Sequence, residues 1–196
     1  MLPAIELDVC PMNRKIIKST PFGSVGIIWT TGSQNPKIVR VLLSKPELSA
    51  EDRVYALYPN SRACSCAEID DTANGIKRLL DGGAIDFSFD FVDLDLCGEF
   101  QKRVLRAEHQ IPRGSLSTYG LIATYLGKPN GARAVGNALA KNPFPLIVPC
   151  HRAIRSDRHL GGYQGGLEMK RALLEREGIA FDKTGRVKCP RFHYER

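Results

Sequence analysis

The N-terminal stretch of the chain places apolar residues in short, partly alternating runs that are typical of β-strands. The runs cover residues 15–18, 26–29 and 38–43. Segments 21–23 and 31–36 separate them with Pro, Gly and Asn residues, which favour turns. This pattern predicts a small antiparallel sheet.

A second alternating segment follows much later in the same half. Phe87, Phe89 and Phe91 alternate with polar Ser88 and Asp90. The two-residue period predicts one more strand or an extended edge of the sheet.

The other periodic segments repeat their apolar residues at helical spacing. Helices are expected over about 68–81, before Gly82-Gly83; over 98–109; over 118–126, with Ser117 as N-cap; over 131–141; and over 167–177, with Gly178 as the stop. The pair 118–126 and 131–141 is joined by a tight turn and has the pattern of a helix-turn-helix.

The character of the sequence changes after Cys97. We expect an α+β fold in two domains. Residues 1–96 would form a small antiparallel sheet domain, with a tail over 1–14, and residues 97–196 a helical domain with the helix-turn-helix. Asn142-Pro143-Phe144-Pro145 would be a stiff, extended link, because each proline restricts its own backbone and the preceding one.

Composition is that of a globular protein, with 43% hydrophobic and 25% charged residues among 196. The net charge of +7 is divided unevenly. Residues 1–96 hold 10 Lys and Arg against 13 Asp and Glu, whereas residues 97–196 hold 18 against 8 and carry +10. A basic half indicates a polyanionic partner, nucleic acid first, although a solvated basic face without a partner is the alternative.

The sequence contains no apolar run long enough to span a membrane. The first twelve residues carry Glu6 and Asp8 and lack the basic start of a signal peptide. We therefore expect an intracellular protein, cytoplasmic or nuclear, with reduced cysteines and no membrane contact. Cys64 and Cys66 could bind a structural zinc together with Cys10, but their spacing matches no strong zinc signature, and two loop thiols without a ligand are favoured. No other cofactor is expected.

The helix expected over 131–141 is unusual because most of its side chains are tiny. Ala132, Ala134 and Gly136 are among them, while Arg133 is long and cationic. Small side chains let a backbone approach another surface closely. With the basic charge of this half, the pattern favours contact with a nucleic-acid groove over a tightly packed core helix with a solvated Arg133.

One thiol stands among groups that could activate it. Cys150 lies in Pro149-Cys150-His151-Arg152, and Glu177 ends the last predicted helix. An imidazole can take the proton of a thiol, directly or through water, and a carboxylate can orient the imidazole, which together would hold a thiolate near neutral pH. A carboxylate at a helix C-terminus is locally unfavourable, which hints at function. A core cysteine, a structural histidine and an exposed glutamate remain the alternatives for these three residues.

Residues 97–178 resemble the O6-alkylguanine-DNA alkyltransferases, also called methylated-DNA–protein-cysteine methyltransferases. The resemblance is carried by 133–136, 142–152, 162–166 and Glu177-Gly178, and the Asn-Pro and Pro-Cys-His-Arg motifs are its most specific parts. The N-terminal half resembles the family only in 20–23 and in its strand pattern. The resemblance implies DNA repair by direct damage reversal, in which a monomer approaches double-stranded DNA through the minor groove.

The resemblance also implies the chemistry of the site. Cys150 would accept the alkyl group from O6 of guanine, irreversibly and once per molecule. His151 would act as a base through a water molecule, and Glu177 would orient His151. Tyr119 would donate a hydrogen bond to guanine N3, and Asn142 would brace the turn that joins the recognition helix to the site.

Further roles concern DNA and the substrate. Arg133 would fill the gap left by the flipped nucleotide, and the small residues Ala132, Ala134 and Gly136 would face the groove. Tyr163 would pack on the alkyl group. Gln164 departs from the family pattern, in which several members have a smaller residue, often Ser, beside O6.

Three other functions compete with alkyl transfer. A non-enzymatic sensor that binds alkylated DNA would have another residue, typically Trp, in place of Cys150. A DNA-binding regulator would need an additional regulatory domain, for which 196 residues leave little room. A cysteine hydrolase would share Cys and His but would lack the Asn-Pro-x-Pro motif and the paired short helices.

Overall fold

The structure is a computed structural model that describes residues 12–31 and 35–195. Its sheet has the strand order β3-β2-β1-β4, in which β1 (Asn13–Thr20), β2 (Gly23–Thr31) and β3 (Pro36–Leu43) are antiparallel. The short β4 (Arg62–Ala63) pairs with β1 in parallel. The three predicted strands are confirmed, whereas β4 and the helix α1 were not predicted.

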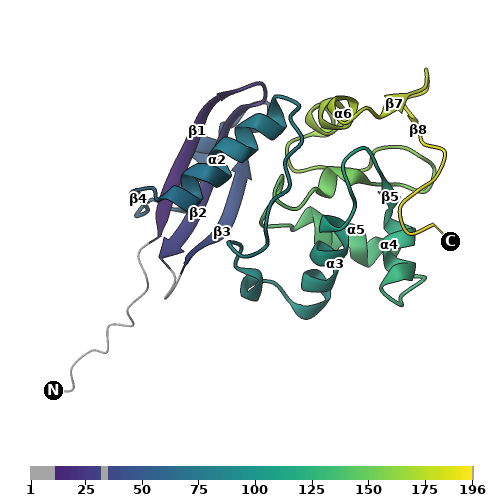
Figure 1. The fold of residues 1–196 in the computed structure, drawn as a ribbon, viewed down its shortest axis with the longest axis horizontal. Helices are drawn as coiled ribbons and strands as arrows, with labels where there is room; N and C mark the ends of the chain where they lie inside the picture. The colour runs from purple at the N-terminus through teal and green to yellow at the C-terminus, as the bar shows by residue number, and fades with distance from the viewer. Residues whose placement is uncertain (1–11, 32–34, 196) are drawn as a thin grey trace.

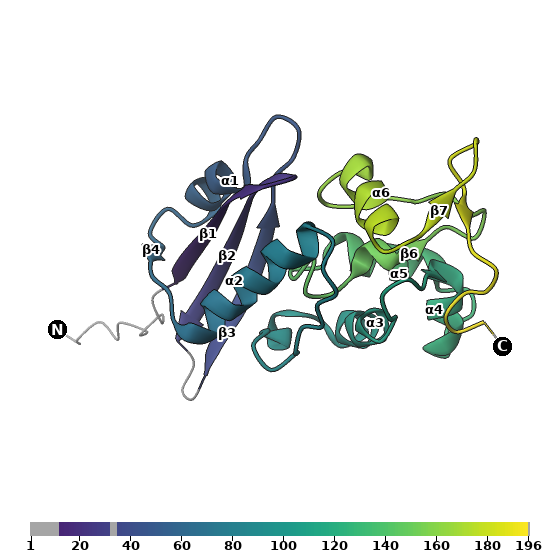
Figure 2. The ribbon, with the colours of Figure 1, turned by 45° about the horizontal axis from the view of Figure 1, so that its top comes forward.

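Two helices cover opposite faces of this sheet (Figure 2). α2 (Ala67–Leu80) packs on the face that carries Ile27 and Trp29, and its bounds confirm the predicted helix. α1 (Ala50–Leu57) packs on the other face, against Ile28. Its only buried residues are Ala50 and Val54, so its apolar pattern is too short to signal a helix from sequence.

The strand or extended edge predicted over 87–91 is wrong, because Phe89 to Phe91 form a bend and turn in which the Val92 amide donates to the Phe89 carbonyl at 3.1 Å. Ile38 donates its amide hydrogen to the Phe91 carbonyl at 2.6 Å, and Asp93 donates to the Ile38 carbonyl at 2.9 Å. An isolated parallel β-bridge joins Ile38 of β3 to Val92, the residue after this segment. The three phenylalanines are partly buried against the core, so side-chain packing rather than a ladder holds the segment.

The C-terminal part of the molecule, residues 97–195, is mainly helical (Figure 1). Its helices are α3 (Glu99–His109), α4 (Tyr119–Tyr125), α5 (Ala132–Ala140) and α6 (Leu167–Arg176), with 3-10 turns η1 (Leu94–Leu96) before them and η2 (Cys150–Arg152) between α5 and α6. Two pairs of two-residue strands complete it: β5 (Ser117–Thr118) is parallel to β6 (Ala153–Ile154), and β7 (Ala180–Phe181) is antiparallel to β8 (Val187–Lys188). α4 and α5 pack together across a short turn, which confirms the helix-turn-helix.

Two local predictions were wrong. The N-cap of α4 is Thr118, whose hydroxyl accepts the Leu121 amide hydrogen at 3.1 Å. Ser117 instead belongs to β5, and its hydroxyl donates to the His193 carbonyl at 2.8 Å. The link after α5 is not extended, because Val148 donates to the Phe144 carbonyl at 2.8 Å and the chain turns back on itself.

One hydrophobic cluster runs from the sheet into the C-terminal part. It includes Ile27 of β2, Ile76 of α2, Leu105 of α3 and Val135 of α5. A backbone hydrogen bond of 2.8 Å from Val41 to the Pro143 carbonyl crosses the same junction. The sheet therefore supports the segment that leads from α5 to Cys150.

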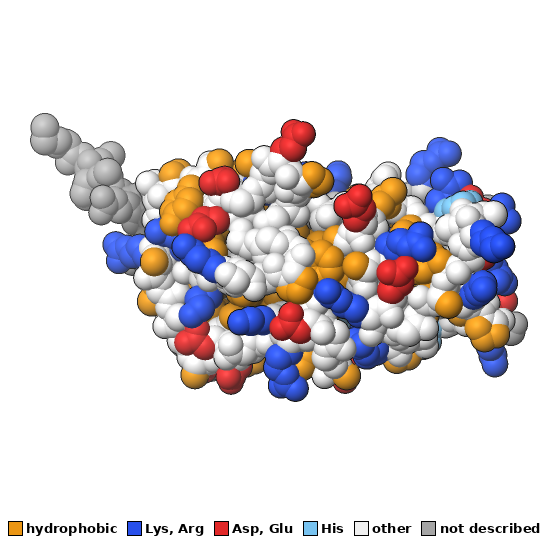
Figure 3. Space-filling model, turned by 90° about the horizontal axis from the view of Figure 1, so that it is seen from above, with side chains coloured by type: hydrophobic (Ala, Val, Ile, Leu, Met, Phe, Trp, Pro, Cys, Tyr) orange, Lys and Arg blue, Asp and Glu red, His pale blue; other side chains and the backbone are white. Residues whose placement is uncertain are grey.

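Figure 3 shows Lys and Arg side chains crowded at the end opposite the grey trace, where the C-terminal part lies. No helix in the described part of the chain is long and apolar enough to cross a membrane.

Within residues 12–31 and 35–195, no three His, Cys, Asp or Glu side chains are grouped as metal ligands, and Cys10 lies outside these ranges. The zinc suggested for Cys64 and Cys66 gains no support.

Candidate active site

Cys150 sits at the start of η2, at the end of a buried turn. Leu146 adopts a positive φ of 75°, and the Cys150 amide donates to the Val148 carbonyl at 2.8 Å. The Cys150 residue is only 5% exposed, and its thiol is free. The turn therefore holds the Cys150 thiol in a position that is almost inaccessible to solvent.

Asn142 is the hydrogen-bonding centre of this turn. Its Nδ2 lies 3.3 Å from the Cys150 sulfur and 3.5 Å from the Val148 carbonyl, and its Oδ1 accepts the Phe144 amide hydrogen at 2.9 Å. Its own carbonyl accepts a hydrogen bond of 2.6 Å from Gln164 Nε2. Asn142 thus braces the turn and donates directly toward the sulfur.

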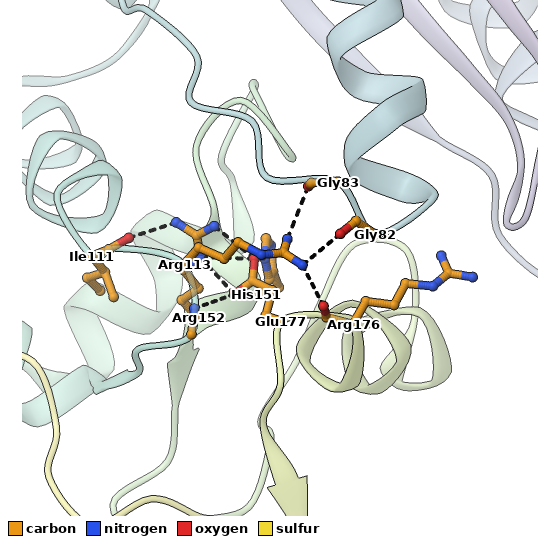
Figure 4. A network of polar contacts seen from close by, with 9 residues as sticks. Gly82, Gly83, Ile111, Arg113, His151, Arg152, Arg176 and Glu177 are labelled. Atoms are coloured by element: carbon orange, nitrogen blue, oxygen red, sulfur yellow. Dashed lines mark hydrogen bonds and ion pairs between the residues drawn. The ribbon is translucent and has the colours of Figure 1, made fainter.

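His151, Arg152 and Glu177 form a buried charge cluster (Figure 4). His151 Nε2 lies 3.0 Å from Glu177 Oε1. Arg152 contacts both oxygens of the same carboxylate, and its Nη1 donates to the Ile111 carbonyl at 2.7 Å. His151 is fully buried, and its Nδ1 has no hydrogen-bond partner in the described part of the chain. The imidazole therefore has one nitrogen oriented by Glu177 and one free to accept a proton.

The charges of the cluster follow from this geometry. Burial raises the pKa of the Glu177 carboxyl, but hydrogen bonds from His151 and Arg152 outweigh burial and bring the pKa to about 2. Burial lowers the pKa of His151, although Glu177 opposes this effect. Near pH 7, Glu177 is ionised and His151 is neutral, which suits a base.

Cys150 is protonated at rest. Burial raises the pKa of its thiol to about 11, against the hydrogen bond from Asn142, which lowers it. The expectation of a thiolate held near neutral pH therefore does not describe the resting site. A base must remove the thiol proton during the reaction.

The sulfur lies in the wall of a cavity of about 790 Å³. Tyr119, Tyr163 and Gln164 line this cavity with Cys150, and Lys45 reaches it from the N-terminal half. Burial raises the pKa of Tyr119 to about 12, so its phenol stays a hydrogen-bond donor. A Cβ at Gly161 would lie 2.8 Å from the Tyr119 hydroxyl oxygen, so only glycine fits beside this hydroxyl.

Tyr163 lies beside both His151 and the cavity. The ring of Tyr163 meets the His151 ring edge-on at a centroid distance of 6.2 Å. The Tyr163 hydroxyl is buried and has no hydrogen-bond partner among the described residues. A buried phenol without a partner can donate to a bound substrate.

The predicted recognition helix, α5, divides its residues between the core and the surface. Val135, Ala138 and Leu139 are buried, whereas Arg133 and Ala134 are exposed and Ala132 is half-buried. A Cβ built on Gly136 would meet no atom within 4 Å. The side chain of Arg133 makes no hydrogen bond or ion pair with the described residues. The small residues therefore leave an open surface beside an unpaired arginine.

Three buried charged residues at the site were not assigned roles from sequence. Arg152 belongs to the Pro-Cys-His-Arg motif but received no function. Glu108 of α3 and Lys170 of α6 are fully buried, and they occupy the apolar stripes of their helices. Lys170 Nζ donates to the Ala153 carbonyl at 2.6 Å. Helical periodicity applied to charged residues would have found both.

Glu108 and Lys170 both act on the Cys150 thiol: Glu108 raises its pKa and Lys170 lowers it. Burial raises the pKa of Glu108 to about 8, opposed by Lys170, Arg152 and the Ala153 amide. Burial lowers the pKa of Lys170 to about 8. Neither carboxylate oxygen of Glu108 makes a regular hydrogen bond in the described structure, so this acid is costly to ionise.

Comparisons with known proteins agree with this site. The family described as "6-O-methylguanine DNA methyltransferase, DNA binding domain" matches residues 99–179. A methylated-DNA–protein-cysteine methyltransferase of Pyrobaculum aerophilum is 46% identical over 103 residues, which are 52% of this chain and 68% of the relative. The chain belongs to the methylated-DNA–protein-cysteine methyltransferase family. This membership confirms the resemblance found from the sequence.

Other family members match different shares of the chain. The Methanothermobacter thermautotrophicus methyltransferase is 46% identical over 109 residues, 56% of this chain but only 61% of the relative. The solved Mycobacterium tuberculosis O6-methylguanine methyltransferase has a TM-score of 0.67 at 30% identity and covers 85% of this chain and 92% of that chain. The same mycobacterial protein in complex with DNA has a TM-score of 0.63 at 29% identity over 84% and 92% of the two chains. Structural similarity thus extends into the N-terminal sheet, beyond the family match over 99–179.

Proposed function

We propose that this protein repairs DNA by moving an alkyl group, such as methyl, from O6 of guanine in duplex DNA to its own Cys150. The observation that carries the proposal is the shared cavity. Cys150 lines one wall of it, and Gly136, Leu139 and Ala140 of α5 line another. The nucleophile and the helix with the open, small-residue surface therefore meet at one site.

The reaction is a displacement at the alkyl carbon. His151 takes the thiol proton through a water between Nδ1 and the sulfur, and Glu177 stabilises the imidazolium that forms. A new S–C bond forms while the C–O6 bond breaks, and the electron pair passes to the guanine. Tyr119 donates a hydrogen bond to guanine N3, which stabilises the negative charge of the leaving base until the base takes a proton from water at N1, and the imidazolium of His151 returns its proton to water. No cofactor takes part in these bonds.

Duplex DNA must open before this reaction, because O6 lies inside the base stack. Flipping a nucleotide out costs a few kcal/mol. Arg133 would enter the helix from the minor groove and occupy the gap, while Ala132, Ala134 and Gly136 allow the α5 backbone to come close. The basic charge of residues 97–196 would hold the phosphates.

The alkyl group would lie among the remaining wall residues. Tyr163 would pack on it, and Gln164, tied to the Asn142 carbonyl, would stand where O6 arrives. Gln164 is larger than Ser, so transfer of bulky alkyl groups such as benzyl would be slower than transfer of methyl but would still take place.

We also propose single use, because a thioether is stable and the mechanism supplies no step that cleaves it. The domain that does this chemistry would be 97–196, supported by a sheet domain over 1–96. We propose that the protein acts as a monomer, as the family resemblance implies. A reaction that needs a free thiol favours an intracellular location, in the cytoplasm or nucleus.

A DNA-side assay tests the proposal against a DNA-binding sensor. Purified protein is mixed with duplex DNA that contains one O6-methylguanine, and the base is analysed after digestion. The proposal expects one guanine restored per protein molecule and no turnover with excess DNA. Binding without restored guanine would establish the sensor instead, and restoration in large excess over protein would contradict single use.

A further inference from the structure

We propose that Arg113 is a positioning residue that makes the placement of Glu177 depend on the N-terminal sheet domain. Arg113 lies in the loop between α3 and β5. Its Nη1 donates to the Gly83 carbonyl at 3.1 Å, and its Nη2 donates to the Gly82 carbonyl at 2.8 Å and to the Arg176 carbonyl at 2.5 Å. Figure 4 shows this guanidinium between the ends of α2 and α6.

The three acceptors are carbonyls at or just beyond helix C-termini. Gly82 and Gly83 follow the C-cap of α2, and Arg176 is the last residue of α6. The Arg176 carbonyl belongs to the last turn of α6, where carbonyls lack partners within the helix and carry the negative end of its dipole, and the Gly82 and Gly83 carbonyls lie just beyond the end of α2. A planar guanidinium with five donors can serve both ends at once. One side chain therefore joins α2, which packs on the sheet, to α6, whose C-cap is Glu177.

The same loop also contacts Glu177 directly. The carbonyl bound by Arg113 belongs to the residue before Glu177, and the Gly114 amide lies 3.5 Å from Glu177 Oε2. A Cβ at Gly114 would lie 3.4 Å from the Glu177 carbonyl oxygen. Residues 113 and 114 thus fix both the backbone and the carboxylate of Glu177, which in turn orients His151.

Arg176 provides a comparison within the structure. Its Nη1 donates to the Leu80 carbonyl, and its guanidinium lies 4.7 Å from the centroid of the Phe22 ring. These contacts also tie α6 to α2 and to the β1–β2 turn. The guanidinium makes no hydrogen bond to Cys150, His151 or Glu177 in the described structure. Loss of Arg176 would weaken the junction, whereas loss of Arg113 would weaken the junction and also loosen the backbone that places Glu177.

This inference rests on the proposed function and adds a role for the N-terminal half, which lies outside the family match over residues 99–179. Three variants test it: Arg113→Ala, Arg113→Lys and Arg176→Ala. Two reactions of Cys150 are followed in each: transfer from O6-benzylguanine, and alkylation by iodoacetamide between pH 5 and pH 9. In the second reaction the sulfur displaces iodide, an S–C bond forms, and the thiol proton leaves through His151 to the solvent.

We expect Arg113→Ala to slow both reactions about tenfold at equal folded fraction, which is about 1.4 kcal/mol. His151 is faced by Glu177, Arg152 and Lys170, and Glu177 raises its pKa. With Glu177 displaced, the acid limb of the rate profile should move to lower pH. Arg113→Lys should recover part of the rate. Arg176→Ala should lower the midpoint of thermal unfolding while it leaves the rates within about twofold.

Equal rate losses in Arg113→Ala and Arg176→Ala would overturn the inference, as would an acid limb that does not move in Arg113→Ala. The iodoacetamide reaction needs neither DNA nor guanine. A wild-type protein that takes no alkyl group from O6-alkylguanine would refute the proposed function alone, and a shifted iodoacetamide profile in Arg113→Ala would still support the positioning role.

Discussion

Arg152 and Glu177 form a buried, two-point ion pair. Arg152 Nη2 lies 2.8 Å from Oε1 and Nε lies 3.0 Å from Oε2, and the two side chains are 6% and 2% exposed. His151 shares the same carboxylate. The Glu177 carboxylate, which orients His151, is therefore held by the guanidinium of Arg152, the residue that follows His151 in the sequence.

Removal of that cation should destabilise the fold and slow the reaction. Arg152→Met leaves Glu177 buried with His151 as its remaining side-chain partner. Loss of one member of a buried pair typically costs about 3–5 kcal/mol. Arg152→Lys keeps the positive charge but loses the two-point contact of the guanidinium, so it should lower the free energy of unfolding by less than Arg152→Met. Urea unfolding and the rate of Cys150 alkylation measure the two effects.

Arg171→Ala is the matched control, because Arg171 pairs with Glu175 on the exposed surface of α6 at 2.9 Å. Exposed pairs contribute about 0–1 kcal/mol. Similar losses of unfolding free energy in Arg152→Met and Arg171→Ala would contradict the importance assigned to the buried pair.

The buried Glu108 predicts a dependence of stability on pH. Its pKa in the folded protein is about 8, against 4.5 for an ordinary glutamate. A group with a raised folded pKa contributes its full stability below pH 4.5, and this contribution is lost as the pH rises through 8. Glu108→Gln lacks this loss. Relative to wild type, its unfolding free energy should increase by up to about 1.4 kcal/mol per pH unit between pH 5 and pH 8.

Glu168→Gln, on the exposed surface of α6, is the control for the loss of one carboxylate. Chemical unfolding at several pH values compares the three proteins. Parallel pH curves for wild type and Glu108→Gln would show that Glu108 does not titrate as its burial requires.

The sequence predicted the three long strands, α2 and the C-terminal helices because their apolar periods are long and regular. It failed where tertiary contacts decide. Ser117 and Thr118 are both good N-caps, and only the pairing of Ser117 with Ala153 makes Thr118 the cap. The two prolines of 142–145 indicate stiffness, but hydrogen bonds from Asn142 decide that the chain turns.

The same limit applies to the site. Cys150, His151 and Glu177 were expected together, and the structure places His151 against Glu177 and Cys150 at the next position in the turn. The raised pKa of the thiol could not be predicted, because it follows from burial that sequence does not give. The contacts of Arg113 could not be predicted, since its acceptors lie at the ends of two helices far away in the chain.

The protonation states predict the pH profile of the reaction. Because His151 has a lowered pKa and is the base, transfer from O6-benzylguanine should be nearly constant between pH 7 and pH 9 and fall only at a pH below the range in which an ordinary imidazole titrates. In His151→Gln the solvent must remove the proton of a thiol whose pKa is about 11. The slower rate of this variant should then rise about tenfold per pH unit up to pH 9. A flat profile in His151→Gln would rule out His151 as the base.

Arg133 should matter only when the base must leave a duplex. Arg133→Ala is expected to slow repair of duplex DNA about tenfold or more, because nothing then fills the gap, and to leave transfer from free O6-benzylguanine unchanged. Arg78→Ala removes an exposed arginine from α2 as a control for net charge. Rate measurements on both substrates decide the point, and equal losses on both would argue against insertion into the helix.

The identity of the acceptor atom is the central claim, and peptide mass spectrometry tests it most directly. After reaction with DNA that contains O6-methylguanine, the peptide with Cys150 should gain one CH2 in every active molecule, and the peptides with Cys10, Cys64, Cys66, Cys97 and Cys189 should gain none. Cys150→Ser protein should gain no CH2 at all. A methyl group found on another residue, or taken up equally by Cys150→Ser, would contradict the account.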